Sequence, residues 1–198
     1  MLLTNRHILS NNIIMKVAKR DHILTTALEA FHKYGFKRIS MKEIAEFAGI
    51  SRAGLYNEFK TKEEVLNGAI RHYADTLIAE INKGIETKKS TEDKILYAFE
   101  VWSIRSFDEI ISSPEAKELL EGGITFAQES YDESYLKLES IITSILKLHF
   151  KSKDNRKVIS AENTARIIVS ASRGFKIVAK NSKELRKMIQ DQILLILK

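Results

Sequence analysis

Residues 40–62 carry the side chains of this sequence whose types and spacing best suit a chemical role. Arg52 offers paired N–H donors that match the O6 and N7 acceptors of guanine in a DNA major groove. The hydroxyl of Ser40 and the ammonium of Lys42 are groups that bind phosphate oxygens. We therefore expect this segment to act by non-covalent recognition of a nucleic acid.

Two short helices are expected to position these side chains. Ser40 and Glu43 have the spacing of a capping box, in which a hydroxyl and a carboxylate each satisfy a free amide of the first helical turn. Ile44 and Ala45 then supply an apolar side, and Gly49 can adopt the left-handed conformation that ends a helix. We expect a sharp turn at Gly49.

The second helix is expected to begin after Ser51, whose side chain can cap it. Leu55 and Phe59 are four residues apart and would face a core, which leaves Arg52 and Asn57 off that face. Two short helices around a glycine-containing turn form a helix-turn-helix, whose second helix can enter the DNA major groove.

A longer pattern surrounds this motif, from about Arg20 to Lys62. It consists of Ile23, Ala27, Phe31, Gly35-Phe36, Ser40, Ile44-Ala45, Ala48-Gly49-Ile50-Ser51, Leu55-Tyr56, Phe59 and Lys62-Glu63-Glu64. This pattern resembles the DNA-binding domain of the TetR/AcrR (tetracycline-repressor-like) family of transcriptional regulators. The resemblance covers roughly a quarter of the chain.

The resemblance implies roles for individual residues. Tyr56 and Lys62 match family positions that hold phosphate. Ala53 and Gly54 depart from the family pattern, which commonly has Gly and Thr there, so a frequent hydroxyl–phosphate contact is lost or replaced. Their small size would let the helix end lie close to the bases. The full set expected at the DNA is Ser40, Lys42, Ser51, Arg52, Ala53, Gly54, Tyr56, Asn57 and Lys62.

Charge and composition agree with this interpretation. Residues 1–60 hold ten Lys or Arg against five Asp or Glu, so they carry most of the net charge of +6. A basic excess on the helix-turn-helix segment is what a phosphate backbone requires. With 44% hydrophobic residues, one Pro and no Cys, the chain is expected to be folded and mainly helical, without disulfides or thiolate metal sites.

The first fifteen residues have little helical or strand periodicity. We expect either a flexible leader or an upstream extension of a protein whose natural start is Met15, and the sequence leaves both open. No apolar run approaches the ~20 residues that span a bilayer. A cytoplasmic location without membrane contact is therefore expected.

Apolar residues at three- and four-residue steps predict helices along the rest of the chain. These cover about 18–34 and 62–88, then 91–112, then Pro114 to about Leu120, and, after a break at Gly122-Gly123, a long helix to about Phe150. A loop is predicted at 151–157, before two last helices capped by Ser160 and Ser182.

The fold class expected is all-α, with two domains. Residues 1–62 would form a three-helix helix-turn-helix domain, joined by a long helix to a helical ligand-binding and dimerisation domain over 63–198. The last two helices have broad apolar faces that need a partner surface. The resemblance implies a homodimer through about 160–198, in which Ala171, Ser172 and Gly174 would permit close approach.

The middle helices hold much of the aromatic content. The resemblance implies that they enclose a small-molecule pocket, for which the candidate lining residues are Phe99, Glu100, Trp102, Phe107, Phe126, Tyr131 and Tyr135. Glu100 lies on an otherwise apolar face, so it is expected either to pair with a Lys or Arg or to recognise a ligand. Core packing alone explains any one of the aromatic residues.

Other constellations argue against an enzyme or a cofactor. Glu29 and His32 have the spacing of half a di-iron carboxylate motif, but the sequence has no second Glu-x-x-His. Phosphate loops and nucleophile elbows are missing as well. No catalytic residue, metal or cofactor is therefore expected.

The sequence favours a DNA-binding transcriptional regulator, most often a repressor in the resembled family, that acts on an inverted-repeat operator and is released by a small-molecule inducer. One alternative is a helical-bundle lipid carrier or enzyme with an incidental helix-turn-helix. Another is a protein-interaction scaffold that does not bind DNA. The operator sequence, the regulated genes, the inducer and the sign of regulation cannot be inferred from the sequence.

Overall fold

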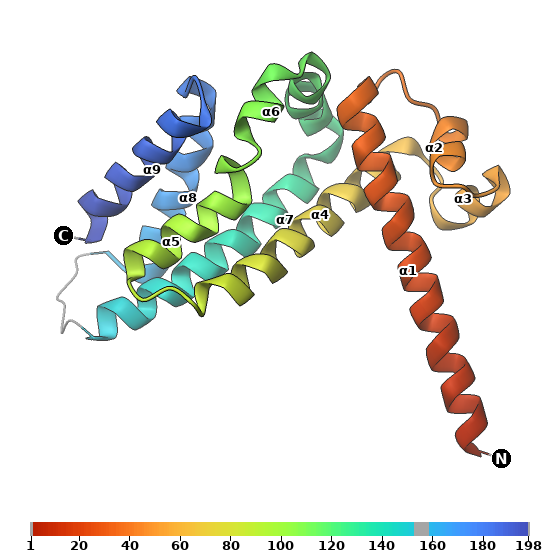
Figure 1. The fold of residues 1–198 in the computed structure, drawn as a ribbon, viewed down its shortest axis with the longest axis horizontal. Helices are drawn as coiled ribbons and strands as arrows, with labels where there is room; N and C mark the ends of the chain where they lie inside the picture. Colours follow the sequence, from red (N-terminus) through yellow and green to blue (C-terminus); the bar gives the residue numbers. More distant parts are fainter. Residues whose placement is uncertain (1, 153–158, 198) are drawn as a thin grey trace. The chain divides into compact units, whose positions relative to one another are not determined.

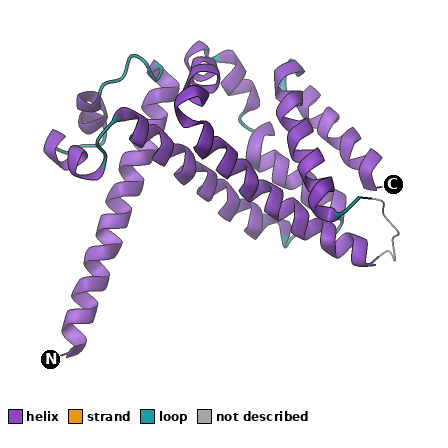
Figure 2. Cartoon of the chain, turned by 180° about the vertical axis from the view of Figure 1, so that it is seen from behind, coloured by secondary structure: helices purple, strands orange, loops and turns teal. Residues whose placement is uncertain are grey.

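The computed structural model describes residues 2–152 and 159–197, with side chains described for 14–116, 125–151 and 159–197. All regular structure in these residues is helical, and Figures 1 and 2 show helices joined by short loops. The all-α class expected from the sequence is confirmed. No helix of the described residues is both long and apolar enough to cross a membrane.

The chain divides into two compact units. The first unit is Met1–Tyr73 with Ser113–Ser130, and the second unit is Ala74–Ser112 with Tyr131–Lys198. Helix α4 (Lys62–Ile85) contains both the boundary expected between residues 62 and 63 and the change of unit after Tyr73. Helix α7 (Pro114–Ser152) also contributes to both units.

The first unit begins with α1 (Leu2–Tyr34). The helix predicted over 18–34 is present, and helical structure extends back to Leu2, through the residues expected to form a flexible leader or an upstream extension. Gly35 ends α1 with a φ of 84°, a left-handed conformation that favours glycine. Its amide donates a 2.9 Å hydrogen bond to the carbonyl of Phe31.

The next two helices follow the predicted boundaries. Helix α2 (Met41–Phe47) starts at Ser40 with a complete capping box, and Gly49 has a φ of 63° at the turn. Helix α3 (Arg52–Glu58) starts at Ser51, whose Oγ accepts a 3.0 Å hydrogen bond from the Gly54 amide. Ile23, Phe31, Ile44, Leu55 and Phe59 form a buried core among α1, α2 and α3.

In the second unit, the end of α4 packs on α5 (Thr91–Phe99), which Ser90 caps. The two helices approach closely at Gly84, where an added Cβ would lie 2.1 Å from the ring of Tyr97. A larger residue at position 84 would therefore collide with α5.

The single helix predicted over 91–112 is wrong. The chain forms α5, then the π-helical turn η1 (Glu100–Ile104), then α6 (Phe107–Ser112). In η1 the amide of Arg105 donates to the carbonyl of Glu100 at 3.1 Å, which is the wider i to i+5 pattern. The extra residue in this turn rotates the later side chains relative to an unbroken α-helix.

Helix α7 begins as predicted, with Ser113 as cap and Pro114 as first residue. The break predicted at Gly122-Gly123 is wrong, because the backbone is helical there and departs from helical geometry at Ala127 (φ −132°, ψ 20°). The carbonyl of Phe126 accepts a 3.0 Å hydrogen bond from the side chain of Asn67 at this irregularity. The predicted loop at 151–157 overlaps the end of α7, and residues 153–157 lie outside the described residues.

The chain ends with α8 (Ala161–Val178) and α9 (Ser182–Leu197). Ser160 caps α8 as predicted, but the cap of α9 is Asn181, whose side chain accepts a 2.8 Å bond from the Glu184 amide. One apolar core in the second unit includes Ile81, Phe99, Leu138, Ile168 and Leu185.

Leu138 and Leu136 on α7 provide a matched test of this core. Leu138 is 0% exposed, so Leu138→Ala should lower the free energy of unfolding by about 2–5 kcal/mol through lost apolar burial and a cavity. Leu136 is 61% exposed, so Leu136→Ala should change it by less than about 0.5 kcal/mol. Urea denaturation followed by circular dichroism measures both, and equal losses would contradict the packing described.

Candidate nucleic-acid interface

Helix α3 presents two different faces. Leu55 and Phe59 are buried, whereas Arg52, Tyr56 and Asn57 are exposed, as expected for residues off the buried face. Exposed groups on the side away from the core can reach a nucleic acid without disturbing the fold. Arg52 therefore has both the chemistry and the exposure needed to contact a base edge.

The start of α3 is compact. A Cβ added at Gly54 would lie 3.1 Å from the Ser51 Oγ and 3.8 Å from the Lys19 Nζ. The glycine therefore leaves room for the cap, and the ammonium of Lys19 lies beside the first turn of the helix. Ala53, which is exposed, adds only a methyl group there.

Glu58 is the acidic residue of α3, and an unpaired acid near DNA would be unfavourable. Its carboxylate pairs with the guanidinium of Arg20 at 3.6 Å, and only 14% of the Glu58 side chain is exposed. The same guanidinium lies 4.3 Å from the centre of the Phe59 ring. Glu58 is thus turned toward α1, and its charge is balanced within the first unit.

Lys62 is engaged inside the first unit. Its Nζ donates to the carbonyl of Phe36 at 2.8 Å and lies 4.5 Å from the centre of the Phe36 ring. These contacts tie the start of α4 to the segment between α1 and α2. A phosphate contact by Lys62, which the resemblance implies, would have to share or replace the bond to Phe36.

Ser40 and Lys42 lie at the start of α2. The amide of Ser40 donates to the Glu43 carboxylate at 2.8 Å, and its hydroxyl donates to the same oxygen at 2.7 Å. These two bonds hold the pKa of Glu43 below its ordinary value of 4.5, with smaller contributions from the charges of Lys42 and Lys62. The ammonium of Lys42 is exposed and lies 3.6 Å from Glu46, so it is available at the surface.

The aromatic residues proposed for a ligand pocket are only partly brought together. Phe99 and Phe107 are buried in the core of the second unit. Trp102 and Tyr135 are half-buried, with ring centres 5.4 Å apart. Phe126 belongs to the first unit, where it is 51% exposed and contacts Phe36.

Two cations border the Trp102–Tyr135 pair. The guanidinium of Arg173 lies 4.5 Å from the centre of the Tyr135 ring, and the ammonium of Lys176 bonds to the Tyr135 hydroxyl. Arg173 also pairs with Asp132 at 3.2 Å. Burial raises the pKa of the nearby Tyr131 to about 12, with a smaller contribution from Tyr135, so Tyr131 is a neutral phenol at neutral pH.

Glu100 pairs with Arg186 of α9 at 2.7 Å, so the expected pairing with a Lys or Arg is the outcome observed. This bond joins the π-helical turn to α9. Arg105 forms two hydrogen bonds to Glu80 of α4 at 2.9 and 3.0 Å. Position in the sequence could not reveal either partner, because each lies at least 25 residues away.

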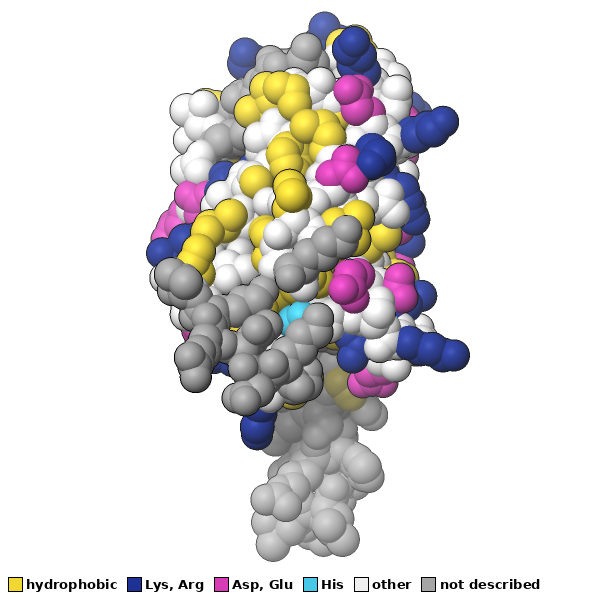
Figure 3. Space-filling view, turned by 90° about the vertical axis from the view of Figure 1, so that its left-hand side faces the viewer, with side chains coloured by type: hydrophobic (Ala, Val, Ile, Leu, Met, Phe, Trp, Pro, Cys, Tyr) yellow, Lys and Arg dark blue, Asp and Glu magenta, His cyan; other side chains and the backbone are white. Residues whose placement is uncertain are grey.

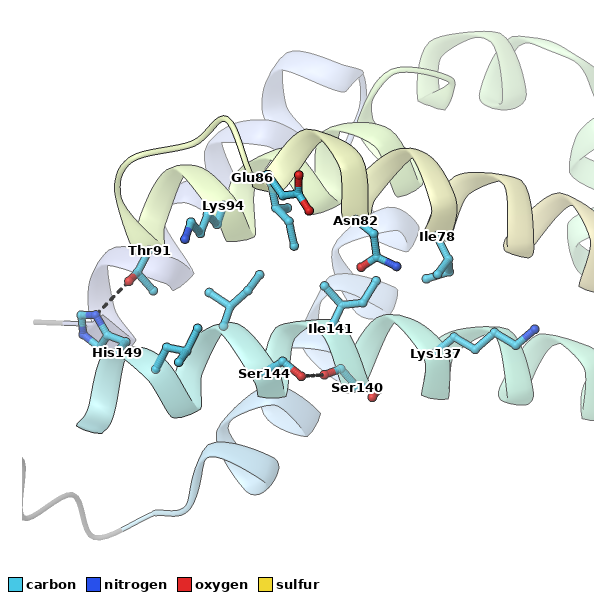
Figure 4. Close-up of a pocket in the computed structure, with 13 residues that line it drawn as sticks. Ile78, Asn82, Glu86, Thr91, Lys94, Lys137, Ser140, Ile141, Ser144 and His149 are labelled. Carbon is cyan, nitrogen blue, oxygen red and sulfur yellow. Dashed lines mark hydrogen bonds between the residues drawn. The ribbon is translucent and has the colours of Figure 1, made fainter. Parts of the chain in front are cut away.

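A groove in the second unit was not anticipated from the sequence. It has a volume of about 710 Å³ and lies between α4, the start of α5 and α7, as Figure 4 shows. Its lining comprises Ile78, Asn82, Ile85, Glu86, Thr91, Lys94, Lys137, Ser140, Ile141, Ser144, Ile145, Leu148 and His149. None of the seven residues proposed for a ligand pocket is among them. The isoleucines belong to stripes that periodicity assigned to core packing.

The described residues contain no group of three or more His, Cys, Asp or Glu side chains that could hold a metal ion. Glu29 and His32 are both exposed on α1.

The outer faces of α8 and α9 expose apolar side chains, namely Ile167, Ile177, Val178, Leu194 and Leu195. Figure 3 shows apolar side chains gathered in a band on the side of the molecule that carries these helices. Gly174 has open space around it, so a close neighbour could approach the backbone of α8.

Comparison with known proteins gives a consistent result. Residues 23–69 match the family model described as bacterial regulatory proteins, tetR family. The HTH-type transcriptional repressor KstR2 of Mycolicibacterium smegmatis is 30% identical over 106 residues, which are 52% of each protein. The HTH-type transcriptional regulator RutR of Escherichia coli is 36% identical over 62 residues, 31% of this chain and 29% of RutR. The chain thus matches about half or less of the length of these relatives.

Solved structures share the fold over nearly the whole chain. A Rhodococcus sp. protein described as a TetR-family transcriptional regulator superposes with a TM-score of 0.71 over 91% of this chain and 100% of its own, at 17% identity. FadR of Bacillus subtilis, crystallised with stearoyl-CoA, superposes with a TM-score of 0.66 over 89% of this chain and 97% of its own, at 14% identity. At these identities the similarity establishes the fold alone.

The capping box of α2 can be tested by titration. Because the folded pKa of Glu43 is lowered, its contribution to stability is present above pH 4.5 and is lost as the pH falls through the folded pKa. Ser40→Ala removes the hydroxyl bond, so the midpoint of the Glu43 titration should rise toward 4.5, as measured by carboxyl NMR shifts. Ser51→Ala, which removes the cap of α3 instead, should leave that midpoint unchanged. An unaltered Glu43 titration in Ser40→Ala would show that the box does not form.

Proposed function

Because the chain belongs to the TetR family of transcriptional regulators, we propose that it binds one DNA sequence through α3 and represses transcription there until a small molecule releases it. The single observation that carries the proposal is the exposure of Arg52, Tyr56 and Asn57 on α3, while Leu55 and Phe59 are buried. Family membership makes the chain a regulator rather than an enzyme. A cytoplasmic location accompanies this role.

Base recognition is assigned to Arg52 and Asn57. A guanidinium binds guanine O6 and N7 through two hydrogen bonds, and an amide binds adenine N6 and N7 in the same way. Both side chains are exposed. Because Ala53 and Gly54 add little side-chain volume at the start of α3, this end of the helix can approach base edges. The preferred half-site should therefore contain a guanine and an adenine a few base pairs apart.

Phosphate contacts surround this centre. Ser40, Lys42 and Tyr56 are exposed, and their groups suit phosphate oxygens. Lys62 can join them by sharing its ammonium with the Phe36 carbonyl. Contacts of this kind set the position of the protein on the duplex and make its affinity depend on salt.

A homodimer would place two copies of α3 on the DNA. The apolar outer faces of α8 and α9 support this proposal, since such faces are costly to leave in water. Two-fold symmetry calls for an inverted-repeat operator whose half-site centres are separated by about 34–36 Å.

An effector site around Trp102 and Tyr135 completes the proposed function. Both rings are half-buried, and two cations border them, so an aromatic or anionic small molecule is the chemistry that fits. Glu100 and Tyr131 would lie at the margin of such a site, whereas Phe99 and Phe107 support it from the core. Helix α4, which starts at Lys62 beside α3 in sequence, offers a continuous element through which binding could bias DNA affinity.

A helical-bundle carrier or enzyme with an incidental helix-turn-helix is the alternative. Salt-dependent binding to duplex DNA separates the two, because a carrier has no reason to release counterions from a phosphate backbone.

Arg52 and Lys62 should have separable effects on DNA binding. Arg52→Ala should cost about 1–3 kcal/mol on the operator selected by the purified protein and should relax its sequence preference. Lys62→Ala should weaken all duplexes similarly and reduce the salt slope by about one. Titrations on selected and random duplexes at several salt concentrations measure both.

Lys89→Ala provides the control, since Lys89 is an exposed cation of the second unit and should leave the slope unchanged. A thermal melt of Lys62→Ala separates loss of its bond to Phe36 from loss of a phosphate contact. A lower melting temperature with an unaltered salt slope would assign Lys62 to the fold alone. A selected site without dyad symmetry would refute the dimer.

The effector site predicts a reciprocal effect that Trp102 can report. A molecule that binds there should change the emission of this single tryptophan and weaken operator binding by roughly 5–150-fold. The operator should weaken the molecule's binding by the same factor, because coupling between two binding equilibria is reciprocal. Tyr135→Phe should reduce effector affinity, whereas Tyr97→Phe, on α5 against Gly84, should not. If an effector releases DNA but leaves the Trp102 emission unchanged in both the Tyr135→Phe and the Tyr97→Phe variant, the effector does not bind beside Trp102.

A further inference from the structure

The groove between α4, α5 and α7 is a second candidate binding site, separate from the aromatic residues around Trp102. Its volume of about 710 Å³ is in the range of small-molecule sites. The lining residues on α7 run from Lys137 to His149, which corresponds to about 18 Å at a rise of about 1.5 Å per residue. The groove therefore suits an elongated ligand that lies parallel to α7.

Part of the groove has aliphatic side chains on both of its walls. It is formed by Ile78 and Ile85 of α4 and by Ile141, Ile145 and Leu148 of α7. Figure 4 shows Ile78 and Ile141 facing the space between the two helices. Leu148 is 69% exposed, which is a large apolar area for water to cover. An apolar chain along this stretch would remove that area from water.

Cationic and hydrogen-bonding groups collect at one end. The ammonium of Lys94 lies at the same end as Thr91 and His149, whose side chains are joined at 3.0 Å between Oγ1 and Nδ1. His149 is buried and contacts the ring of Phe150, so its imidazole is held in place. A fixed imidazole, a hydroxyl and an ammonium together form a suitable end for an anionic group.

Two other charged residues, Glu86 and Lys137, line the groove. Lys137 lies at the opposite end, where it pairs with Asp75 outside the lining. Glu86 is exposed on the α4 side of the groove, where Figure 4 draws it between Lys94 and Asn82. Lys94, unlike Glu86, lies with Thr91 and His149 at the end of the groove, so an anionic group is favoured there.

We propose that this groove binds an amphipathic anion, with its aliphatic chain along Ile85, Ile141 and Leu148 and its carboxylate, sulfate or phosphate beside Lys94. The site does not depend on DNA binding or on the proposed effector site, and it would stand if either failed. Binding here would fill the space between α4 and α7 in the second unit.

Three decyl compounds distinguish the chemistry: decanoate, decan-1-ol and decyltrimethylammonium, each below its micelle concentration. Calorimetry with the full chain should give saturable binding at one site per chain, with decanoate bound about tenfold more tightly than either of the others. That ratio is the effect of roughly one charge-assisted hydrogen bond. Decyl phosphate and decyl sulfate then distinguish which anionic head binds best.

Variants locate the binding. Lys94→Gln should weaken decanoate about tenfold and leave decan-1-ol unchanged, and Lys94→Arg should restore most of the affinity. The matched control is Lys147→Gln, since Lys147 pairs with Glu162 and lies outside the lining. Ser144→Phe, which places a large side chain in the groove, should abolish binding of both compounds while the helical circular dichroism stays the same.

Three results would overturn the proposal: equal affinity for decanoate and decyltrimethylammonium, an unaltered affinity in Lys94→Gln, or undiminished binding in folded Ser144→Phe. Operator titrations in the presence of decanoate address a separate matter. If DNA affinity is unaffected while decanoate binds as described, the groove is a site without a regulatory role. If the protein binds no DNA, the proposed function fails and the groove still stands on its own measurements.

Discussion

Helices α2 and α3 are seven residues each, a length at which an isolated helix does not persist in water. Their existence depends on side chains that satisfy their first amides and on the core they share with α1. Ser40 and Ser51 accept amide hydrogen bonds at the two helix starts, while Ile44, Leu55, Phe59 and, on α1, Phe31 are buried. Because these inward residues fix the rotation of α3, they also decide that Arg52 and Asn57 face outward.

Charge in the first unit serves the fold as well as the surface. Arg20 pairs with Glu58 and lies over Phe59, and Lys62 is bonded to the carbonyl of Phe36. Both cations would otherwise count toward a phosphate-binding surface. The net charge of the first unit therefore does not show which cations can reach DNA. Arg52 can, because its guanidinium lies at the exposed start of α3.

Within the described residues, the helical backbone departs from α-helical geometry at the turn η1 and at Ala127, and both places have bonding partners on other helices. The π-helical turn at Glu100 is linked to α9 through Arg186, and Asp108, a few residues later, accepts hydrogen bonds from Ser182 at the start of α9. The irregular backbone at Ala127 leaves the Phe126 carbonyl to the side chain of Asn67. Interruptions of this kind are tolerated because the freed backbone or the displaced side chains find partners on other helices.

Local chemistry explains what the sequence determined by itself. The caps at Ser40, Ser51, Ser90 and Ser160, the glycine turns at Gly35 and Gly49, and the two faces of α3 each depend on residues within a few positions of one another. Apolar periodicity placed most of the helices for the same reason. The all-α class, the similarity of residues 23–69 to the TetR family model and the exposure of Arg52, Tyr56 and Asn57 could therefore be predicted.

Tertiary structure decided the rest, because the interactions concerned join residues far apart in the chain. Nothing near Glu100 in the sequence identifies Arg186 as its partner, and the glycines at 122 and 123 predict a break, whereas the backbone departs from helical geometry at Ala127. The groove beside Lys94 exists only where α4 and α7 run together, so its isoleucines cannot be told from core residues by spacing. Periodicity identifies the apolar face of a helix, but only the neighbouring helices determine whether that face is filled or left open.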